Sequence, residues 1–406
     1  MNYRIKDILG IVGRGFATIV LIALLAIVVT SLSPIYDFSE PRSFSGPDIF
    51  NPYRSLDTTK RWQRANFHTH TRVEGPTNEC DYWPHEVLEA YDAFDYDIVT
   101  FSNHNLVTEH PHPERQVDLY EHGYNLLKYH KLVFGPRDGV MHFDHLLPIL
   151  ASQRQWQIDL LLEECDLIQL NHPARTHLST KSTLQKLSGY TIMELDSGKT
   201  SENEYWDWAL SAGHYSFGLA NDDLHYPDRS SKIAVRCNFM QCKSASYDDI
   251  KQALEEGCYY AMRIPDYGAG DWEIKLKMNR TIPYIKQIGV EHNTIYASFS
   301  EPAESITLYG ANHTILSELN DSCDIEYCLP ESEPYARIVA KFEDGEILYT
   351  NPFARYDSSL SDKPDSNSYH TINWALTIAF NTLLGVIALL TVALIIKMWQ
   401  HKKQQR

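Results

Sequence analysis

The sequence predicts an α/β fold held between two membrane helices, and three observations support this prediction. Short apolar runs alternate with helix-like stretches from residue 62 to about residue 265. Residues 271–358 instead alternate between apolar and polar positions, which is typical of antiparallel strands. Two uncharged apolar runs lie near the ends of the chain. With 406 residues, the chain is long enough for two ordinary domains and membrane segments.

The two apolar runs cover residues 16–33 and 374–396. A helix needs about 20 apolar residues to cross the hydrocarbon core, so both runs are expected to be transmembrane helices. The alternative for the first run is a cleaved signal peptide, but no convincing small-residue cleavage site follows it. Basic residues flank the two runs on their outer sides: Arg4, Lys6, Arg14, Lys397, Lys402, Lys403 and Arg406. The positive-inside rule therefore predicts a cytoplasmic N-terminus (1–15), a cytoplasmic basic tail (397–406) and an extracytoplasmic main domain.

Between the helices, residues 34–61 are rich in Ser, Pro and Asp and are expected to form a linker. Residues 62–265 contain three uninterrupted apolar runs, at 95–102, 165–171 and 189–197, which are typical of buried parallel strands. Helix-like stretches separate these runs. The alternation predicts an α/β barrel or a doubly wound sheet.

The segment 271–358 is expected to be a small antiparallel β-sandwich without helices. Its clearest local signal is Asp344-Gly345, which lies between two alternating arms and predicts a β-hairpin.

Composition restricts the partners and the redox chemistry. The formal net charge of −17 argues against a nucleic-acid backbone as the main partner, because phosphate binding needs clustered Lys and Arg. None of the seven cysteines forms the CxxC pairs of a zinc ribbon. Cys323 and Cys328 could close a small disulfide loop in an oxidising compartment, and free thiols are the alternative.

Histidine and aspartate concentrate at the ends of expected strands, where α/β active sites are built. His68 and His70 are two apart on one strand and therefore point to the same face. The full candidate set is His68, His70, His104, His172, Asp223 and His225. Imidazole and carboxylate ligands without thiolate suit Zn²⁺, Mn²⁺ or iron in a hydrolytic site. The sequence therefore predicts one to three divalent ions.

The order of these motifs is HTHT (68–71), SNHN (102–105), NHPAR (171–175) and DDLH (222–225). This order resembles the PHP (polymerase and histidinol phosphatase) family. The resemblance implies a distorted (β/α)7 barrel over residues 62–265, with a metal cluster at its mouth and phosphoesterase activity. It makes the six candidate residues the metal ligands. It also gives the role of a mid-barrel ligand to His145, with His142 as a rival.

Two departures from the family pattern are visible. Asn103 stands where the family usually has aspartate, and residues 134–138 lack the glutamate of a Gly-x-Glu motif that often bridges metals. The candidates for a replacement carboxylate are Glu74, Asp81 and Asp138. Without the bridging residue, the resemblance favours one or two ions over three.

The expected function is a membrane-anchored hydrolase that attacks a small phosphate ester with metal-activated water. Arg175 is expected to bind the phosphate bidentately, and a surface salt bridge is its alternative role. Lys199 is a weaker candidate of the same kind, and no side chain is assigned as general acid. Two other functions stay open: a barrel that has lost catalysis and binds a ligand or partner, and a hydrolase of C–N bonds.

Overall fold

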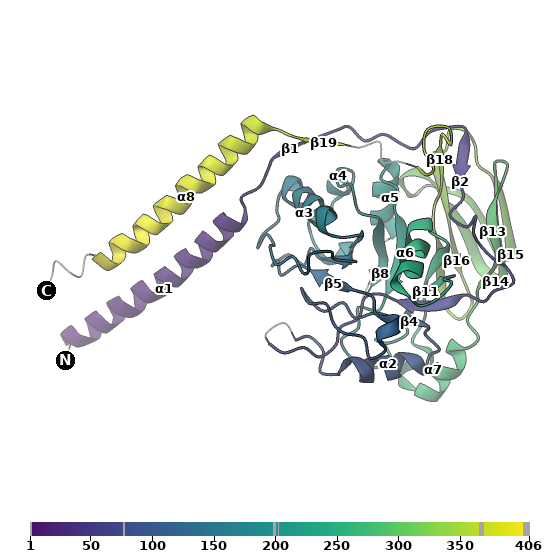
Figure 1. Cartoon of the computed structure of the whole chain (residues 1–406), viewed down its shortest axis with the longest axis horizontal. Helices are drawn as coiled ribbons and strands as arrows, with labels where there is room; N and C mark the ends of the chain where they lie inside the picture. Colours follow the sequence, from purple (N-terminus) through teal and green to yellow (C-terminus); the bar gives the residue numbers. More distant parts are fainter. Residues whose placement is uncertain (1, 76–77, 198–199, 202, 365–368, 401–406) are drawn as a thin grey trace.

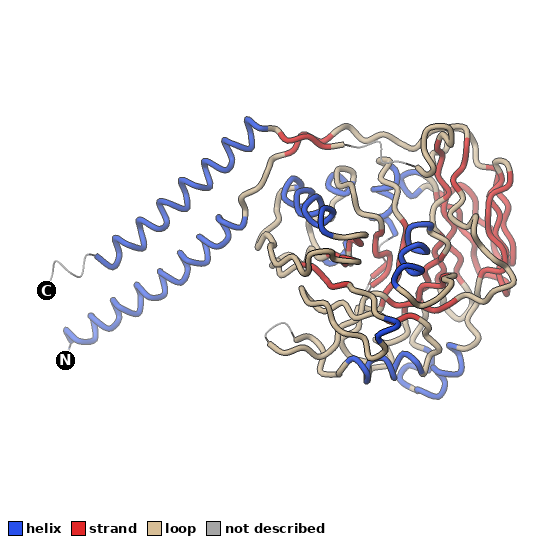
Figure 2. Tube along the Cα trace, viewed as in Figure 1, coloured by secondary structure: helices blue, strands red, loops and turns tan. Residues whose placement is uncertain are grey.

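The computed structural model describes residues 2–75, 78–197, 200–201, 203–364 and 369–400. Its first and last helices, α1 (Asn2–Thr30) and α8 (Trp374–Gln400), run side by side away from a globular part that contains the other elements (Figures 1 and 2). Both helices are long and apolar enough to cross a membrane, and their side chains are largely exposed. Trp399 at the far end of α8 donates to the hydroxyl of Thr18 on α1.

The chain ends are also joined next to the globular part. Strand β1 (Tyr36–Phe38) follows α1 and pairs antiparallel with β19 (His370–Ile372), which precedes α8. The segment predicted as a linker contains a second strand, β2 (Asp48–Phe50), which pairs with β18 (Phe353–Tyr356). Residues 34–61 are therefore ordered along the globular part, and the linker prediction is wrong in this respect. The local sequence of residues 34–61 is polar and does not indicate that its backbone pairs with distant strands.

The smaller of the two main sheets has the strand order β10-β8-β7-β6-β5, with β9 paired to β8. Its strands are β5 (Leu119–His122), β6 (Lys131–Phe134), β7 (Leu167–Leu170), β8 (Ile192–Ser197), β9 (Thr200–Ser201) and β10 (Phe217–Asn221). Strands β7, β8 and β10 are parallel, whereas β6 runs antiparallel to both β5 and β7. The first residue of β6 therefore lies at the same edge as the last residues of β5 and β7.

The larger sheet has eleven strands in the described part of the chain and the central order β13-β14-β16-β17-β12-β11-β3-β4. Strand β15 pairs with β14, and β18 and β2 are attached through β16. The remaining bounds are β3 (Gln63–Asn66), β4 (Ile98–Val99), β11 (Arg236–Met240), β12 (Tyr259–Arg263), β13 (Ile285–Glu291), β14 (Thr294–Tyr309), β15 (Ile315–Cys328), β16 (Tyr335–Lys341) and β17 (Ile347–Thr350).

Two isolated parallel bridges connect the sheets close to the candidate site. Thr69, beyond the end of β3, pairs with Leu224, and His104 pairs with Glu121 of β5. The described strands do not form one closed sheet, so the architecture is a mixed α/β arrangement of two sheets joined at single bridges. The strands expected at 95–102, 165–171 and 189–197 are confirmed as β4, β7 and β8, each shorter than its apolar run.

Helices cover both sheets. Those between the terminal helices are α2 (Pro84–Asp92), α3 (Ala151–Glu164), α4 (Lys181–Leu184), α5 (Asn203–Ser211), α6 (Tyr247–Glu256) and α7 (Trp272–Asn279). Ile158 of α3 and Trp206 of α5 are fully buried in one apolar cluster with Met193 of β8. Helix α6 ends at Gly257, whose φ of 79° and close approach to Phe217 leave no room for a Cβ atom. These contacts fix the strands from which the site residues project.

The region 271–358 departs from its prediction in two ways. Helix α7 lies inside it, and β17 pairs with β12, so its strands extend the larger sheet across the expected domain boundary. Alternation along a strand shows which face is buried but not which strand lies beside it. The hairpin at Asp344-Gly345 is confirmed, because β16 and β17 pair directly around it. Cys323 and Cys328 both lie on β15 as free thiols.

Candidate metal centre

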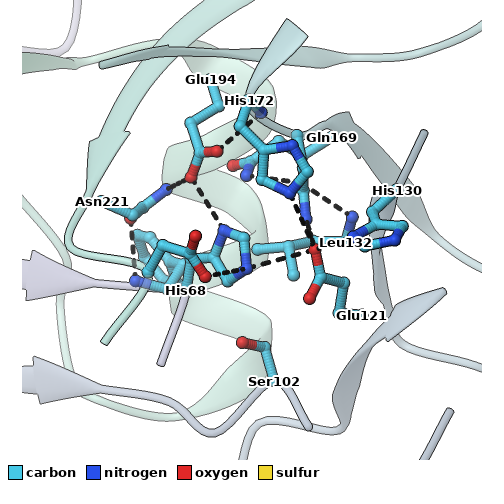
Figure 3. A network of polar contacts seen from close by, with 12 residues as sticks. His68, Ser102, Glu121, His130, Leu132, Gln169, His172, Glu194 and Asn221 are labelled. Carbon is cyan, nitrogen blue, oxygen red and sulfur yellow. Dashed lines mark hydrogen bonds and ion pairs between the residues drawn. The ribbon is translucent and has the colours of Figure 1, made fainter. Parts of the chain in front are cut away.

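The candidate metal-binding residues come from several elements that meet at one edge of the two sheets. His68 and His70 follow β3, and His104 follows β4. Glu121 is in β5, His130 directly precedes β6, and His172 follows β7. Asp223 and His225 follow β10, and Glu79 comes from the loop before α2. Figure 3 shows His68, His130 and His172 around Glu121.

Glu121 lies at the centre of the cluster and is fully buried. Its Oε1 is 3.3 Å from His68 Nε2, 3.1 Å from His130 Nδ1 and 3.2 Å from His172 Nε2. Its Oε2 is 3.3 Å from the Nε2 atoms of both His70 and His104. The two carboxylate oxygens therefore face two different sets of imidazoles, as expected of a carboxylate that bridges two ions.

Asp223 is a second carboxylate that several histidines of the cluster contact. Its Oδ1 is 3.1 Å from His68 Nε2, 3.3 Å from His70 Nε2 and 3.4 Å from His225 Nε2. Its Oδ2 is 2.5 Å from Nη1 of Arg175. His68 and His70 thus lie between the carboxylates of Glu121 and Asp223. Arg175 contacts the other oxygen of Asp223.

Glu79 closes the cluster on its solvent side. Its Oε2 is 3.4 Å from His104 Nε2 and 3.7 Å from His225 Nδ1, and its side chain is half-exposed. The hydrogen bond from His104 lowers the pKa of Glu79 to about 2. Glu79 is therefore an ionised, accessible carboxylate at the entrance.

The inner histidines are held in place by Glu194 of β8 (Figure 3). Its Oε1 is 3.0 Å from His68 Nδ1 and accepts from Asn221 Nδ2 at 3.2 Å, and its Oε2 accepts the backbone N–H of His172 at 2.8 Å. Nδ1 of His68 is the donor in this contact, because the side chain of Glu194 supplies only acceptors when ionised. His68 thereby presents Nε2 to the cluster, in the manner of metal-binding histidines oriented by a carboxylate.

The electrostatics of the cluster keep its carboxylates ionised. Burial alone would raise the pKa of Glu121, but His104, His68 and His130 outweigh it and hold the pKa well below its usual value. Burial would likewise lower the pKa of His70, yet the neighbouring carboxylates of Asp223 and Glu121 raise it to about 9. The buried carboxylates stay ionised because positive charge lies next to them. That charge comes either from protonated imidazoles or from bound cations.

The donor set fits divalent metal ions. Metal–nitrogen and metal–oxygen bonds of about 2.1 Å place two ligand atoms of one ion roughly 3.0–3.4 Å apart, which is the range of the separations around Glu121 and Asp223. Nε2 of His68 and Nε2 of His70 are buried and have no hydrogen-bond partner among the described residues. Buried imidazole nitrogens that face carboxylates without a well-formed hydrogen bond are costly unless an ion is bound to them.

The backbone is strained at two of these residues. His172 has φ 27° and Asp223 has φ 50°, values that L-residues adopt rarely. Such conformations persist where the surrounding structure enforces them, and they are frequent at functional sites. At His172, the hydrogen bond from its backbone N–H to Glu194 is one of the contacts that enforce this conformation.

The structure brings six of the seven predicted ligands together and excludes one. His68, His70, His104, His172, Asp223 and His225 all lie in the cluster. His145 lies elsewhere: its Nδ1 bonds the carbonyl of Thr30 at the end of α1, and its ring packs on Phe143 and Trp156. Its rival His142 is exposed on the same loop. The prediction for His145 is therefore wrong, and the cluster instead contains His130, which was not predicted.

The structure also shows where the candidate carboxylates lie. The groups of ligand atoms within 4.8 Å of one another contain three carboxylates in the described residues, Glu79, Glu121 and Asp223. Asp81 lines the cavity beside them, whereas Glu74 and Asp138 are exposed and outside these groups.

The other two predicted positions are Asn103 and Lys199. The side-chain amide of Asn103 donates hydrogen bonds to the hydroxyls of Thr71 and Thr108. Lys199 lies outside the described residues.

Glu121, His130 and Glu79 were missed in the sequence. Glu121 had a usable signal, since it lies in the strand-like stretch VDLYEHG (117–123), which follows the His104 motif. His130 directly precedes its strand, whereas the predicted histidines of the cluster follow theirs. Glu79 lies in a loop without any periodic pattern.

An open cavity of about 470 Å³ lies over the cluster. Besides ligand candidates, its lining includes the cationic side chains of Lys128 and Arg175 and the ring of Tyr226. The cavity is large enough for a small anionic group to reach the cluster from solvent.

No family model matches the chain, and no curated protein matches its sequence. Among solved structures, the chain is similar to a two-domain protein from Bacteroides vulgatus ATCC 8482 that contains a predicted PHP-like metal-dependent phosphoesterase. The identity is 12%, the TM-score is 0.34, and the match covers 77% of this chain and 99% of that one. It is also similar to a lesion-specific endonuclease from Pyrococcus furiosus, at 12% identity and a TM-score of 0.31, over 48% of this chain and 56% of that one.

Proposed function

We propose that this chain is a metal-dependent hydrolase of the PHP family that cleaves phosphate esters. The observation that supports this most directly is the position of Glu121, whose two oxygens face His68, His130 and His172 on one side and His70 and His104 on the other. A bridging carboxylate among imidazoles is suited to two ions held close together. The alternative of a barrel without catalysis rested on the absent glutamate and on Asn103, and the position of Glu121 between two sets of imidazoles supports catalysis instead.

The residues divide into sets that would each hold an ion. One set, on the Oε1 side of Glu121, is His68, His172 and Asp223, and another, on the Oε2 side, is His70, His104 and Glu79. His225 and Glu79 extend the cluster toward solvent. Ions bound there would activate water and neutralise the charge of a phosphate. The metal identity is open between zinc, manganese and iron, because all three accept this ligand type.

The side chains around the cavity provide the substrate contacts. Arg175 lies at the wall, about a third exposed, with one nitrogen on Asp223. Its guanidinium is suited to orient a phosphate oxygen next to the cluster. Lys128 adds a second cation on the same cavity. The protein thereby offers positive charge to a small anion despite its acidic composition.

We also propose that α1 and α8 anchor the enzyme in a membrane with both termini in the cytoplasm. Their length, apolar composition and exposed side chains support two spans, and the basic flanks support the orientation.

The test is the variant Glu121→Gln in the full chain, compared with Glu318→Gln at an exposed position of β15. Metal content after purification and turnover of an aryl phosphate with added Mn²⁺ or Zn²⁺ are measured. Loss of the bridging charge should lower turnover at least about 100-fold and reduce bound metal, because even outer contacts of a metal site cost 10–100-fold. The control should retain both. Equal activity in the two variants would refute the assignment.

A further inference from the structure

Five exposed apolar side chains form a rim between the end of α1 and the mouth of the metal site. Tyr124 and Leu126 belong to the loop after β5, and Phe143, Ile149 and Leu150 to the loop before α3. Leu126 is 68% exposed and Ile149 is 61% exposed. The N–H of Leu126 donates to the carbonyl of Leu146 at 3.0 Å, which holds the two loops together. These five residues are called the apolar rim below.

One side of the apolar rim is fastened to α1. The ring of His145 bonds the carbonyl of Thr30, the last residue of α1, and the N–H of Leu146 is 3.4 Å from the hydroxyl of the same residue. Gln153 donates to the carbonyl of Ser31 at 3.0 Å. Figure 1 shows β5 and α3 on the side of the globular part that faces α1. The rim therefore lies level with the point where the apolar helix ends.

The other side of the apolar rim borders the metal site. The hydroxyl of Tyr124 donates to the carbonyl of His104 at 3.4 Å, and the two rings are 6.1 Å apart. Tyr124 follows Glu121 by three residues. The same loop carries Lys128, which lines the cavity. The loop after β5 thus contacts both the loop that is bonded to α1 and the entrance to the cluster.

A buried polar network makes these loops rigid. Asp144 accepts from the N–H of Tyr124 at 2.7 Å, from Asn125 at 3.1 Å and from Gln157 at 2.6 Å. Lys131 donates to Gln157 at 2.5 Å. The exposed apolar side chains are therefore presented outward by a fixed scaffold, and a clustered apolar surface of this kind marks an interaction site.

We propose that the apolar rim enters the headgroup region of the membrane spanned by α1 and α8, and that the metal site acts on the phosphate of a membrane lipid. This rests on the proposed function and on the proposed spans. The position of the apolar rim is the reason for choosing the membrane as its partner. A bilayer crossed by the apolar part of α1 ends near Thr30, and the loop that carries part of the rim is bonded to Thr30. Tyr, Phe, Leu and Ile are side chains that bind at this boundary.

The reaction is hydrolysis of a phosphate monoester lipid. Water adds its oxygen to phosphorus, the P–O bond to the glycerol oxygen breaks, and the leaving oxygen takes up a proton. The products are diacylglycerol and inorganic phosphate. Lys128 and Arg175 face the cavity through which the headgroup would enter.

The first experiment compares two substrates with the full chain reconstituted in phosphatidylcholine vesicles that contain phosphatidic acid. The rim variant Leu126→Ser/Ile149→Ser is matched by Ile315→Ser/Leu360→Ser, two exposed apolar residues outside the rim. We expect the rim variant to release phosphate from the lipid about tenfold more slowly, since insertion scales with apolar area. Its turnover of a soluble aryl phosphate should stay unchanged, and the control should keep both activities.

Hydrolysis of the aryl phosphate but not of phosphatidic acid would overturn the lipid assignment and leave the proposed function standing. Failure to cleave either substrate would overturn both. A rim variant that loses both activities equally, or neither, would also contradict the inference.

The second experiment measures insertion without relying on activity. A nitrobenzoxadiazole label is attached to Ile149→Cys or to Leu360→Cys, each in a Cys328→Ser background, because Cys328 is the exposed native thiol. With the protein in nanodiscs, spin-labelled lipid should quench the label at 149 and not at 360. Absence of quenching at 149, for instance because a second copy covers the rim, overturns the inference.

Discussion

At the scale of single residues, Glu194 shows how the cluster depends on a residue that contributes no ligand to it. It is fully buried and holds the ring of His68, the backbone of His172 and the amide of Asn221 at once. It therefore fixes the tautomer of one histidine and the strained backbone of another. Glu194 is a positioning residue.

Glu194→Ala is expected to lower metal affinity about 10–100-fold, which is the usual effect of losing such a contact. Competition with a chromogenic chelator measures this in the purified full chain. Glu194→Gln keeps an acceptor for His68 and should recover part of the affinity. If Glu194→Ala binds metal as tightly as the unmodified protein, Glu194 does not position the ligands.

The sequence predicted most of the ligands because histidines at strand ends form a recognisable order. It did not predict His130, because β6 runs opposite to β7, and its start meets the edge where its neighbours end. Strand direction is set by pairing with distant segments, which local sequence does not encode. His145 was favoured by its position before the run LLPIL, but that run forms a surface loop.

At the scale of elements, a buried ion pair ties α5 to β16. Arg337 and the hydroxyl of Tyr335 both bond the carboxylate of Asp207, and all three side chains are buried. Asp207→Ala would leave Arg337 in the interior without this partner. We expect a loss of about 3–5 kcal/mol in unfolding free energy, measured by denaturant titration, whereas Glu255→Ala on the exposed face of α6 should have little effect.

The same pair predicts a dependence of stability on pH. Burial alone would raise the pKa of Asp207, but the charge of Arg337 and hydrogen bonds from Arg337 and His313 outweigh it and lower the pKa. A lowered folded pKa stabilises the protein above the unfolded value of about 4, and this contribution disappears as the pH falls through the folded pKa. Below about pH 4, unfolding free energy should therefore fall more steeply in the unmodified protein than in Asp207→Asn. Parallel slopes for the two proteins would contradict this.

Element types were easier to predict than their partners. The hairpin around Asp344 and the apolar strands β7 and β8 follow from local chemistry. The separation of a sandwich from the α/β region failed, because β17 pairs with β12 across the expected boundary. Helix α7 was missed because its charged residues give it no apolar stripe.

At the scale of the whole molecule, the orientation in the membrane can be tested with Cys328, which is exposed on β15. A membrane-impermeant maleimide should label it from outside in intact cells or spheroplasts, since the globular part is proposed to be extracytoplasmic. Cys328→Ser should remove that labelling. Labelling that requires permeabilised cells would reverse the orientation.

If α1 and α8 span a membrane as proposed, the pairing of β1 with β19 has a consequence for how the globular part could be released. Each end of this part continues into its own apolar helix, and the two strands clamp the connections together. Any single proteolytic cut, in either connection or in a surface loop, still leaves both fragments attached. Release from the membrane would then require two independent cleavages, one on each side, so two spans of this kind would protect the globular part against accidental release.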